Sequence, residues 1–424
     1  MLKLRNTFAP YTYLFLFDGG IISHVMVSLE KIVHLALGSS FDSLGPAAIN
    51  INQNIDTDRL NALGAGTRYD ICTASCTPRE ASVAGICHSF THDGRCISLF
   101  KTLYTNHCSH QCNYCINAVN CAEKPKIFSY TPEELAKLTL SLYRSNYIEG
   151  LFLSSGAGRD ADLIMEKLIE TARLLRFKYG FPGYIHLKVL PGATLSHIRE
   201  AMELSDRLSV NVEAPSSSHM REISPTKDYE NDIIQRQKYI RDLSDKIGLQ
   251  AGQTTQLVVG SSRENDEEIF RRVLYEYNEL NVMRAYFSAF SPQKGTPFEK
   301  NEPQPRWREH RLYQVDWLYR IYHFESREIK YAFDENGFLS DSDPKVAIAK
   351  EMMDGPVDPN IAKYSDLLHV PGIGPTSARR IIALRRLKRI SRKEELSNLG
   401  VRIKRAAPFL KINGWRDTTL EMWS

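Results

Sequence analysis

The sequence lacks cysteine over most of its length. All eight cysteines of the 424 residues fall between Cys72 and Cys121, and none occurs in the 300 residues that follow. A secreted protein stapled by disulfides would distribute its cysteines over the domain that they hold together. Crowding into one short segment indicates metal or redox chemistry in a reducing compartment, so we expect a cytoplasmic protein.

The sequence also lacks any run of about 18 or more apolar residues, which argues against a transmembrane helix and a membrane partner. The apolar segment YTYLFLF (11–17) is ended by Asp18 and is followed by no small-residue cleavage site, so it does not fit a signal peptide. Low-complexity tracts and internal repeats are missing as well. With 42% hydrophobic and 25% charged residues, the composition is that of a globular protein large enough for more than one domain.

The net charge of the chain is small, but charged residues are unevenly distributed along it. The net charge is +4, yet the segment from Ile361 to Ser424 carries 14 Lys and Arg against 5 Asp and Glu. That local charge of +9 leaves about −5 for the first 360 residues. A basic tail on an acidic body predicts a polyanionic partner that binds through the tail.

Between residues 95 and 290, apolar runs typical of buried strands alternate with amphipathic helices. The runs are ISLFKTLY (97–104), GLFLSS (150–155), YIHLKVL (184–190), RLSVNVE (207–213), TTQLVVG (254–260) and RAYFSAF (284–290). Strands that alternate with helices predict a parallel sheet, and six such units would curl into an open, partial (β/α)6 barrel of the α/β class. Sites in such sheets lie at the carboxyl ends of the strands.

The stretch CSHQCNYC follows the first of these strands and places Cys108, Cys112 and Cys115 in the pattern C-x3-C-x2-C. Three thiolates at this spacing can hold one cubane iron–sulfur cluster and leave its fourth iron without a protein ligand. A structural zinc ion would need four protein ligands. His107 and His110 could complete a zinc site, although positions at the surface or behind the ligands are favoured for them.

This pattern, after the first strand of a partial barrel, resembles the radical S-adenosylmethionine (radical SAM) superfamily. The resemblance implies that SAM chelates the unique iron of a 4Fe–4S cluster and is cleaved to a 5′-deoxyadenosyl radical. It also implies an electron donor such as ferredoxin or flavodoxin. By the same resemblance, the SAM-binding residues are Tyr114, which precedes the third cysteine, the turn Ser154, Ser155 and Gly156, and Glu213 at the end of the fourth strand.

The remaining cysteines have no spacing that defines a ligand set. Cys72, Cys76, Cys87 and Cys96 precede the cluster loop and could hold an auxiliary metal, or could be buried and inert. Cys121 follows the loop, and its thiol could donate a hydrogen atom to a carbon radical or could simply be buried.

The tail segment LLHVPGIGPTSARRIIALRR (367–386) predicts two helices joined by a tight turn. Gly372 and Gly374 allow the backbone to turn closely and to present N–H groups to an anion. The segment resembles a helix-hairpin-helix element, which grips DNA phosphates, and GVRIKRAAPFLKINGW (400–415) resembles its second half. The expected DNA-binding residues are these two glycines together with Arg379, Arg380, Arg385, Arg386, Lys388 and Arg389.

Taken together, the segments YDICTASC, GICHSFTHDGRCISL, NYIEGLFLSSG, GYIHLKVLPGA and RLSVNVEAP resemble a radical SAM family implicated in DNA modification or repair. Members are often encoded beside a uracil-DNA glycosylase-like protein, which that resemblance makes a potential partner. We therefore expect an enzyme that acts on DNA. The alternatives are radical SAM modification of RNA, or a non-catalytic DNA-binding protein with a structural iron–sulfur cluster.

This interpretation divides the chain into four parts. The expected units are an N-terminal extension (1–65), a partial barrel with a cysteine-rich lead-in (66–300), a helical connector (301–360) and a helix-hairpin-helix domain (361–424).

Overall fold

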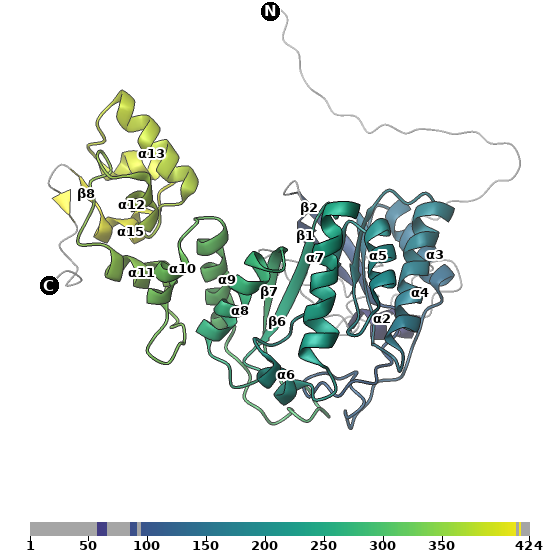
Figure 1. The fold of residues 1–424 in the computed structure, drawn as a ribbon. Helices are drawn as coiled ribbons and strands as arrows, with labels where there is room; N and C mark the ends of the chain where they lie inside the picture. Colours follow the sequence, from purple (N-terminus) through teal and green to yellow (C-terminus); the bar gives the residue numbers. More distant parts are fainter. Residues whose placement is uncertain (1–56, 66–84, 91–94, 413–414, 417–424) are drawn as a thin grey trace, which may run out of the picture.

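The computed structural model describes residues 57–65, 85–90, 95–412 and 415–416, and a curled sheet of seven strands organises most of them (Figure 1). Strand β1 pairs with β2 in the antiparallel sense, and all later neighbours are parallel. The strands lie in the order of the sequence: β1 (Ile86–Phe90), β2 (Cys96–Leu103), β3 (Gly150–Ser154), β4 (Tyr184–Lys188), β5 (Arg207–Ser209), β6 (Gln253–Val259) and β7 (Val282–Ala289).

Six parallel strands confirm the predicted α/β partial barrel, with two differences in detail. Strand β1 was not expected, and it extends the cysteine-rich lead-in along the outer edge of β2. Strand β5 is shorter than the predicted run 207–213, because its regular pairing ends at Ser209. Glu213 therefore lies beyond the strand and not at its end, and it contacts β6 only through an isolated bridge to Leu257.

The helices between the strands begin where local chemistry favours them. Thr131 caps α3 in a reciprocal capping box with Glu134, and Pro132 occupies the first turn. These helices are α3 (Pro132–Arg144), α4 (Ala161–Arg173), α5 (Leu195–Leu204), α6 (Ser217–Ile223), α7 (Gln235–Ile247) and α8 (Asp266–Asn278). Figure 1 shows α3, α4, α5 and α7 along one side of the curved sheet and α6 at one end of it. A short helix, α2 (Thr57–Ala65), packs near β2.

After β7 the chain is helical. Helices α9 (Arg306–Arg320), α10 (Ser326–Ile329) and α11 (Pro344–Met352) lead to a group of four: α12 (Tyr364–His369), α13 (Pro375–Leu387), α14 (Lys393–Asn398) and α15 (Ile403–Ala406). A short hairpin, β8 (Lys411–Ile412) with β9 (Trp415–Arg416), follows them. Buried side chains form a continuous core from the barrel through α9 and α11 into this C-terminal group. The four-part division of the chain stays a prediction.

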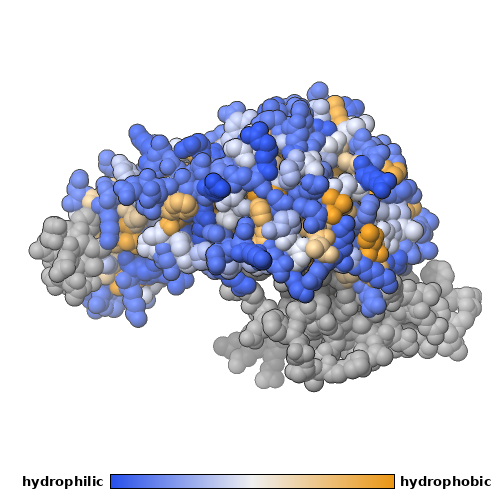
Figure 2. All heavy atoms as spheres, turned by 90° about the horizontal axis from the view of Figure 1, so that it is seen from below, coloured by the Kyte–Doolittle hydropathy of each residue, from blue (hydrophilic) through white to orange (hydrophobic). Residues whose placement is uncertain are grey.

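Two polar contacts fasten the C-terminal group to the connector. The buried Lys345 amine of α11 donates to the carbonyl of Ile373 at 2.6 Å, and Val357 forms a parallel bridge with Leu410. Figure 2 shows a mainly hydrophilic face, on which hydrophobic residues form small separate groups. Among the described helices, none has the length and hydrophobicity that crossing a bilayer requires.

A buried carboxyl group in α8 makes the stability depend on pH. Glu276 is completely buried, and burial raises its pKa to about 7 even though Arg272 and Gln237 contact it. The folded protein therefore holds a proton that the unfolded chain releases near pH 4.5, so stability should fall as the pH rises from about 4.5 to 7.

We expect Glu276→Gln to remove this decline, because the amide resembles the protonated acid and cannot ionise. The effect should reach about 1–3 kcal/mol in the unfolding free energy at pH 8 relative to pH 5, measured by urea titration. The exposed Glu335→Gln is the control and should leave the pH dependence as it is in the wild type. An unchanged pH profile in Glu276→Gln would contradict this account.

Candidate active site

The cysteine loop is attached to β3 by backbone hydrogen bonds that continue the β2–β3 pairing. The amide of Tyr104 donates to Ser154 O at 2.8 Å, the amide of Gly156 donates to Thr105 O at 2.8 Å, and Cys108 forms a parallel bridge with Gly158. A side chain at position 156 would meet the carbonyl of His107 at 2.3 Å. Glycine at this position lets the turn after β3 lie directly against the cysteine loop.

The other side of the loop rests on residues 222–227, at the end of α6 and just beyond it. The amide of Gln111 donates to Thr226 Oγ1 at 2.9 Å, and the amide of Asn113 donates to Ile223 O at 2.8 Å. The thiol of Cys112 lies 3.2 Å from Ser224 Oγ. No sequence pattern pointed to this segment, because a polar loop after a helix is ordinary in any globular protein.

The residues predicted to bind the cluster and SAM come from separate elements and line one pocket. It is lined by the three thiols, by Tyr114 and by residues at or just past the carboxyl ends of the parallel strands. Every predicted cofactor residue belongs to this lining, which includes Cys108, Cys112, Tyr114, Cys115, Ser154, Ser155, Gly156, Lys188, Asn211, Glu213, Lys227 and Gln256.

Burial affects two of the three thiols in the pocket. Burial raises the pKa of Cys112, and it raises the pKa of Cys115 to about 12, with the other thiols contributing. These two groups are therefore protonated in the metal-free protein at neutral pH. Metal binding must displace their protons, because the thiolate is the ligand.

Glu213 is held in an unusual backbone conformation. Its φ angle of 61° lies in the left-handed region, which costs a non-glycine residue on the order of 1 kcal/mol or more. Two backbone hydrogen bonds to β6, with Gln256 at 2.8 Å and Val258 at 2.9 Å, keep it there. The buried carboxylate also accepts a hydrogen bond from the Tyr114 hydroxyl. Strain maintained in this way indicates that the position of this carboxylate matters.

Lys227 is a site residue that sequence reasoning missed. Its side chain is only 9% exposed, and its Nζ lies 3.7 Å from Glu213 Oε1. Burial alone would lower the pKa of this amine, but Cys112, Glu213 and the other two thiols raise it. The ammonium group is therefore a fixed positive charge among groups that become anionic. A single lysine 14 residues after Glu213 has no recognisable motif, so only the fold could place it here.

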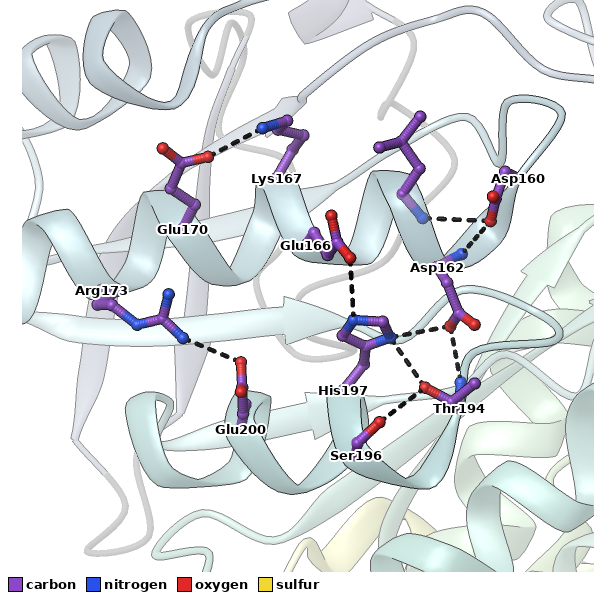
Figure 3. Close-up of polar contacts among 11 residues, drawn as sticks. Asp160, Asp162, Glu166, Lys167, Glu170, Arg173, Thr194, Ser196, His197 and Glu200 are labelled. Atoms are coloured by element: carbon purple, nitrogen blue, oxygen red, sulfur yellow. Dashed lines mark hydrogen bonds and ion pairs between the residues drawn. The ribbon is translucent and has the colours of Figure 1, made fainter.

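Polar contacts outside the pocket brace the two loops that follow β3 and β4 (Figure 3). Asp160 caps α4, and Asp162 accepts from the amide of Thr194 at 2.9 Å. The same carboxylate oxygen of Asp162 lies 2.9 Å from His197 Nδ1. The His197 ring also lies 3.7 Å from Glu166. These contacts tie the start of α4 to the start of α5 and so keep both pocket-lining loops in place.

The other predicted cysteines and histidines lie outside the thiol group. Cys121 is buried, donates to the carbonyl of Glu123 and does not line the pocket. Cys87 lies on β1 and is disulfide-bonded, and Cys96 begins β2. Cys72 and Cys76 fall outside the described residues, and Cys87 cannot be a thiolate ligand while it is disulfide-bonded, so the auxiliary metal site stays an untested prediction. His107 is exposed, and His110 Nδ1 lies 3.3 Å from Thr226 Oγ1.

The basic residues that were predicted to bind DNA differ in their exposure and in their contacts within the protein. Arg379, Arg386 and Arg389 are exposed. Arg385 instead donates to the carbonyls of Pro359 and Ala362, which makes it part of the packing. The remaining two are exposed but engaged, because Arg380 approaches Leu399 O at 3.5 Å and Lys388 pairs with Glu395 at 2.7 Å.

The predicted turn at Gly372 packs against the second pair of helices, α14 and α15. Gly372 has a φ angle of 87°, and its carbonyl accepts from the amide of Arg402 at 3.0 Å. A side chain at position 372 would meet the carbonyl of Arg402 at 2.6 Å. The two helical pairs, α12 with α13 and α14 with α15, thus meet through their turns.

Residues 102–272 match the family model of the Radical SAM superfamily. None of the curated proteins matches the chain. Among solved structures, methylornithine synthase (PylB) is similar at 15% identity, over 52% of this chain and 60% of that protein, with a TM-score of 0.41. The FeFe-hydrogenase maturase HydG from Carboxydothermus hydrogenoformans is similar at 13% identity, over 50% and 48%, with a TM-score of 0.38. The chain thus spans less than two thirds of either protein.

The donor set of the pocket fits a cluster better than a single ion. Three thiols from one loop share the pocket, whereas among the described residues no three His, Cys, Asp or Glu side chains are placed to hold one metal ion. Thiolates bound to different corners of a cubane do not have to converge on a point. The close packing of Gly156 against His107 and Cys108 gives the loop a firm support on the side of β3.

We expect Cys108→Ala, Cys112→Ala and Cys115→Ala each to abolish the four-iron cluster, because water cannot replace a thiolate ligand. Iron content and visible absorption after anaerobic reconstitution measure the loss. Cys121→Ala is the matched control and should retain a full complement of iron, since its thiol lies outside the pocket. Full iron incorporation in any of the three loop variants would disprove the ligand assignment.

Proposed function

We propose that this chain is a radical SAM enzyme that acts on DNA, because residues 102–272 match the family model of the Radical SAM superfamily. Enzymes of this superfamily use a 4Fe–4S cluster and SAM. The observation that supports the proposal most strongly is the meeting of Cys108, Cys112 and Cys115 with the turn after β3 and with Glu213 in one pocket. The substrate is inferred from the basic C-terminal group.

When bound and reduced, the cluster supplies the electron that cleaves SAM to methionine and a 5′-deoxyadenosyl radical. Cys108, Cys112 and Cys115 would hold it. Glu213 and Tyr114 offer a carboxylate and a hydroxyl to the ribose and adenine of SAM, and Ser154, Ser155 and Gly156 line the same pocket. Lys227 supplies a buried positive charge suited to the SAM carboxylate.

Three further polar side chains in the pocket lining suit a substrate with several hydrogen-bonding groups. They are Lys188 at the end of β4, Asn211 beyond β5 and Gln256 on β6. A nucleobase carries donors and acceptors that such side chains can pair with. The partly buried position of these residues would also restrict water near a reactive carbon radical.

The basic C-terminal group is the reason for proposing DNA as the substrate. Its two helical pairs carry exposed arginines that can neutralise phosphates, which is the sequence-independent part of DNA binding. We infer that the two pairs form a helix-hairpin-helix unit, as the tight turn at Gly372 favours. A low-potential donor such as ferredoxin or flavodoxin would supply the electron, and a uracil-DNA glycosylase-like protein stays a proposed partner.

The direct test of the proposed function is whether reduced, cluster-loaded protein converts SAM to 5′-deoxyadenosine under anaerobic conditions, and whether duplex DNA changes the rate. We expect slow turnover without DNA and a faster rate with it. Absence of 5′-deoxyadenosine from a protein with a full, reducible cluster would refute the proposal.

For the SAM site, we expect Glu213→Gln and Lys227→Met to weaken SAM binding by about 10-fold or more, because each removes a charge-assisted contact of roughly 1.5–3 kcal/mol. Equilibrium dialysis against cluster-loaded protein measures this. The exposed Glu222→Gln is the control for Glu213→Gln and should bind SAM as the wild type does. Unchanged affinity in both pocket variants would place SAM elsewhere.

For DNA, we expect the triple variant Arg379→Gln, Arg386→Gln and Arg389→Gln to bind duplexes at least 10-fold more weakly near 100 mM salt. The slope of log affinity against log salt should decrease by roughly 3, one for each lost phosphate contact. Fluorescence anisotropy measures both quantities. A matched triple variant on the barrel helices should change neither; it carries Gln in place of Arg144, Arg199 and Lys246, all exposed. Equal loss in the two triple variants would mean that the barrel carries the DNA surface.

A further inference from the structure

A second cavity lies where the C-terminal group meets the barrel, and the proposed radical chemistry does not use it. Its volume is about 480 Å³, within the range of small-molecule sites. Several parts of the chain form it: β7 at Arg284, the exposed face of α9 around Trp317, the start of α11, and the two turns that carry Gly374 and Arg402.

Basic groups predominate in this cavity. Arg284, Lys345, Arg402 and Arg405 face two carboxylates, Asp316 and Asp343. Both carboxylates are already neutralised, because Asp316 pairs with Arg320 at 2.6 Å and Asp343 pairs with Arg405. The side chains of Arg284, Lys345 and Arg402 therefore have no carboxylate partner among the described residues.

Two of these basic groups are incompletely paired within the described part of the protein. Arg284 Nε is buried and has no hydrogen-bond partner in the described part of the chain. Lys345 is 6% exposed, its Nζ contacts only the Ile373 carbonyl and the face of Tyr322, and burial lowers its pKa to about 7. Buried polar and charged groups left unpaired are costly, so a ligand that pairs with them would be stabilised here.

The start of α13 adds N–H donors to the same wall. Gly374 occupies the capping position and has no side chain to cap the helix, so the amides of Thr376 and Ser377 lack partners within the 13-residue helix. Gly374 and the buried Ser377 both line the cavity. Free N–H groups at a helix start favour a phosphate, and together with the unpaired arginines they define an anion site with two independent supports.

An aromatic surface lies beside the cations. Trp317 is 47% exposed on α9 although it lines the cavity. A large indole left half-uncovered next to arginines is the arrangement that single-stranded nucleic acid sites use, because a base stacks on the ring while its phosphate meets the charge. No comparable aromatic surface is needed to bind a simple anion.

We propose that this cavity binds one nucleotide, with its phosphate at Arg402, Arg284 and the start of α13 and its base against Trp317. The source we favour is a strand of the DNA that the C-terminal group holds, because the exposed Arg379 lies one turn further along the same helix. That choice of source rests on the proposed function, whereas the chemistry of the site does not. The site would hold a strand at the junction, between the basic helices and the barrel.

The test uses the full-length protein and four probes: a 12-nucleotide single strand, the matching duplex, dAMP and inorganic phosphate. Arg402→Gln and Trp317→Ala are the test variants, and Lys404→Gln is the matched control, because Lys404 is exposed on the same turn of α15 but does not line the cavity. We expect the two test variants each to weaken single-strand binding about 5-fold or more, and Lys404→Gln to change it by less than about 2-fold. Trp317→Ala should weaken dAMP binding but leave phosphate binding unchanged.

A strand that binds at least about 10-fold more tightly than dAMP identifies nucleic acid as the ligand, and equal affinity identifies a free nucleotide. The proposal is overturned if Arg402→Gln behaves like Lys404→Gln, or if Trp317→Ala binds every probe as the wild type does. Both test positions are exposed, and equal melting temperatures confirm that the variants fold. Conversion of SAM to 5′-deoxyadenosine without DNA, measured in parallel, separates the two ideas: its absence in the wild type refutes the proposed function and leaves the nucleotide result standing.

Discussion

The parallel register between β2 and β3 is the constraint on which the active site depends. It pairs Leu103 with Ser154 and continues past the strands, through Tyr104 and Gly156, to the bridge between Cys108 and Gly158. The first cysteine is therefore positioned by backbone hydrogen bonds of a sheet and not by a free loop. A shift of one residue in this register would turn the alternate side chains to the other face and separate the thiols from the turn at Gly156.

Charge is organised around that fixed loop. Lys227 and Glu213 form a buried pair, and the lysine also faces three thiols that lose their protons when metal binds. A buried cation is costly unless anions surround it, so Glu213 stabilises the Lys227 ammonium, and thiolates that form beside it would be stabilised by the same positive charge. The left-handed backbone at Glu213 and its hydrogen bonds to β6 keep the carboxylate within reach of both Lys227 and Tyr114. Metal binding and side-chain placement are thus coupled in one pocket.

The C-terminal group is not a loosely tethered appendage. The core runs without interruption through α9 and α11, and Lys345 of α11 holds the carbonyl of Ile373 in the tight turn. The basic helices therefore have a defined position relative to the barrel. The cavity at this junction combines residues from β7, α9 and the two turns, so it exists only because the parts pack in this way.

The sequence by itself determined the general architecture and predicted the metal ligands. Alternating apolar runs and amphipathic segments predicted six parallel strands, since a strand buried on both faces must be apolar throughout, and all six occur near the predicted positions. The spacing of Cys108, Cys112 and Cys115 indicated a cluster because ligands on one short loop carry their geometry within the sequence. Ser154, Ser155 and Gly156 could be placed at the pocket because strand ends in a parallel sheet share one edge.

Only the tertiary structure decided the rest, because it depends on contacts between residues far apart in the chain. Lys227 reaches the thiols across more than 100 residues, and Ser224 and Thr226 support the loop from a segment with no motif. The position of Glu213 beyond β5 follows from hydrogen bonds with β6, which no local pattern encodes. Arg385 has the same sequence signature as its exposed neighbours, yet it packs against Pro359 and Ala362. Whether a charged side chain is buried or paired depends on the packing of the folded chain, so the role of such a residue cannot be inferred from the sequence alone.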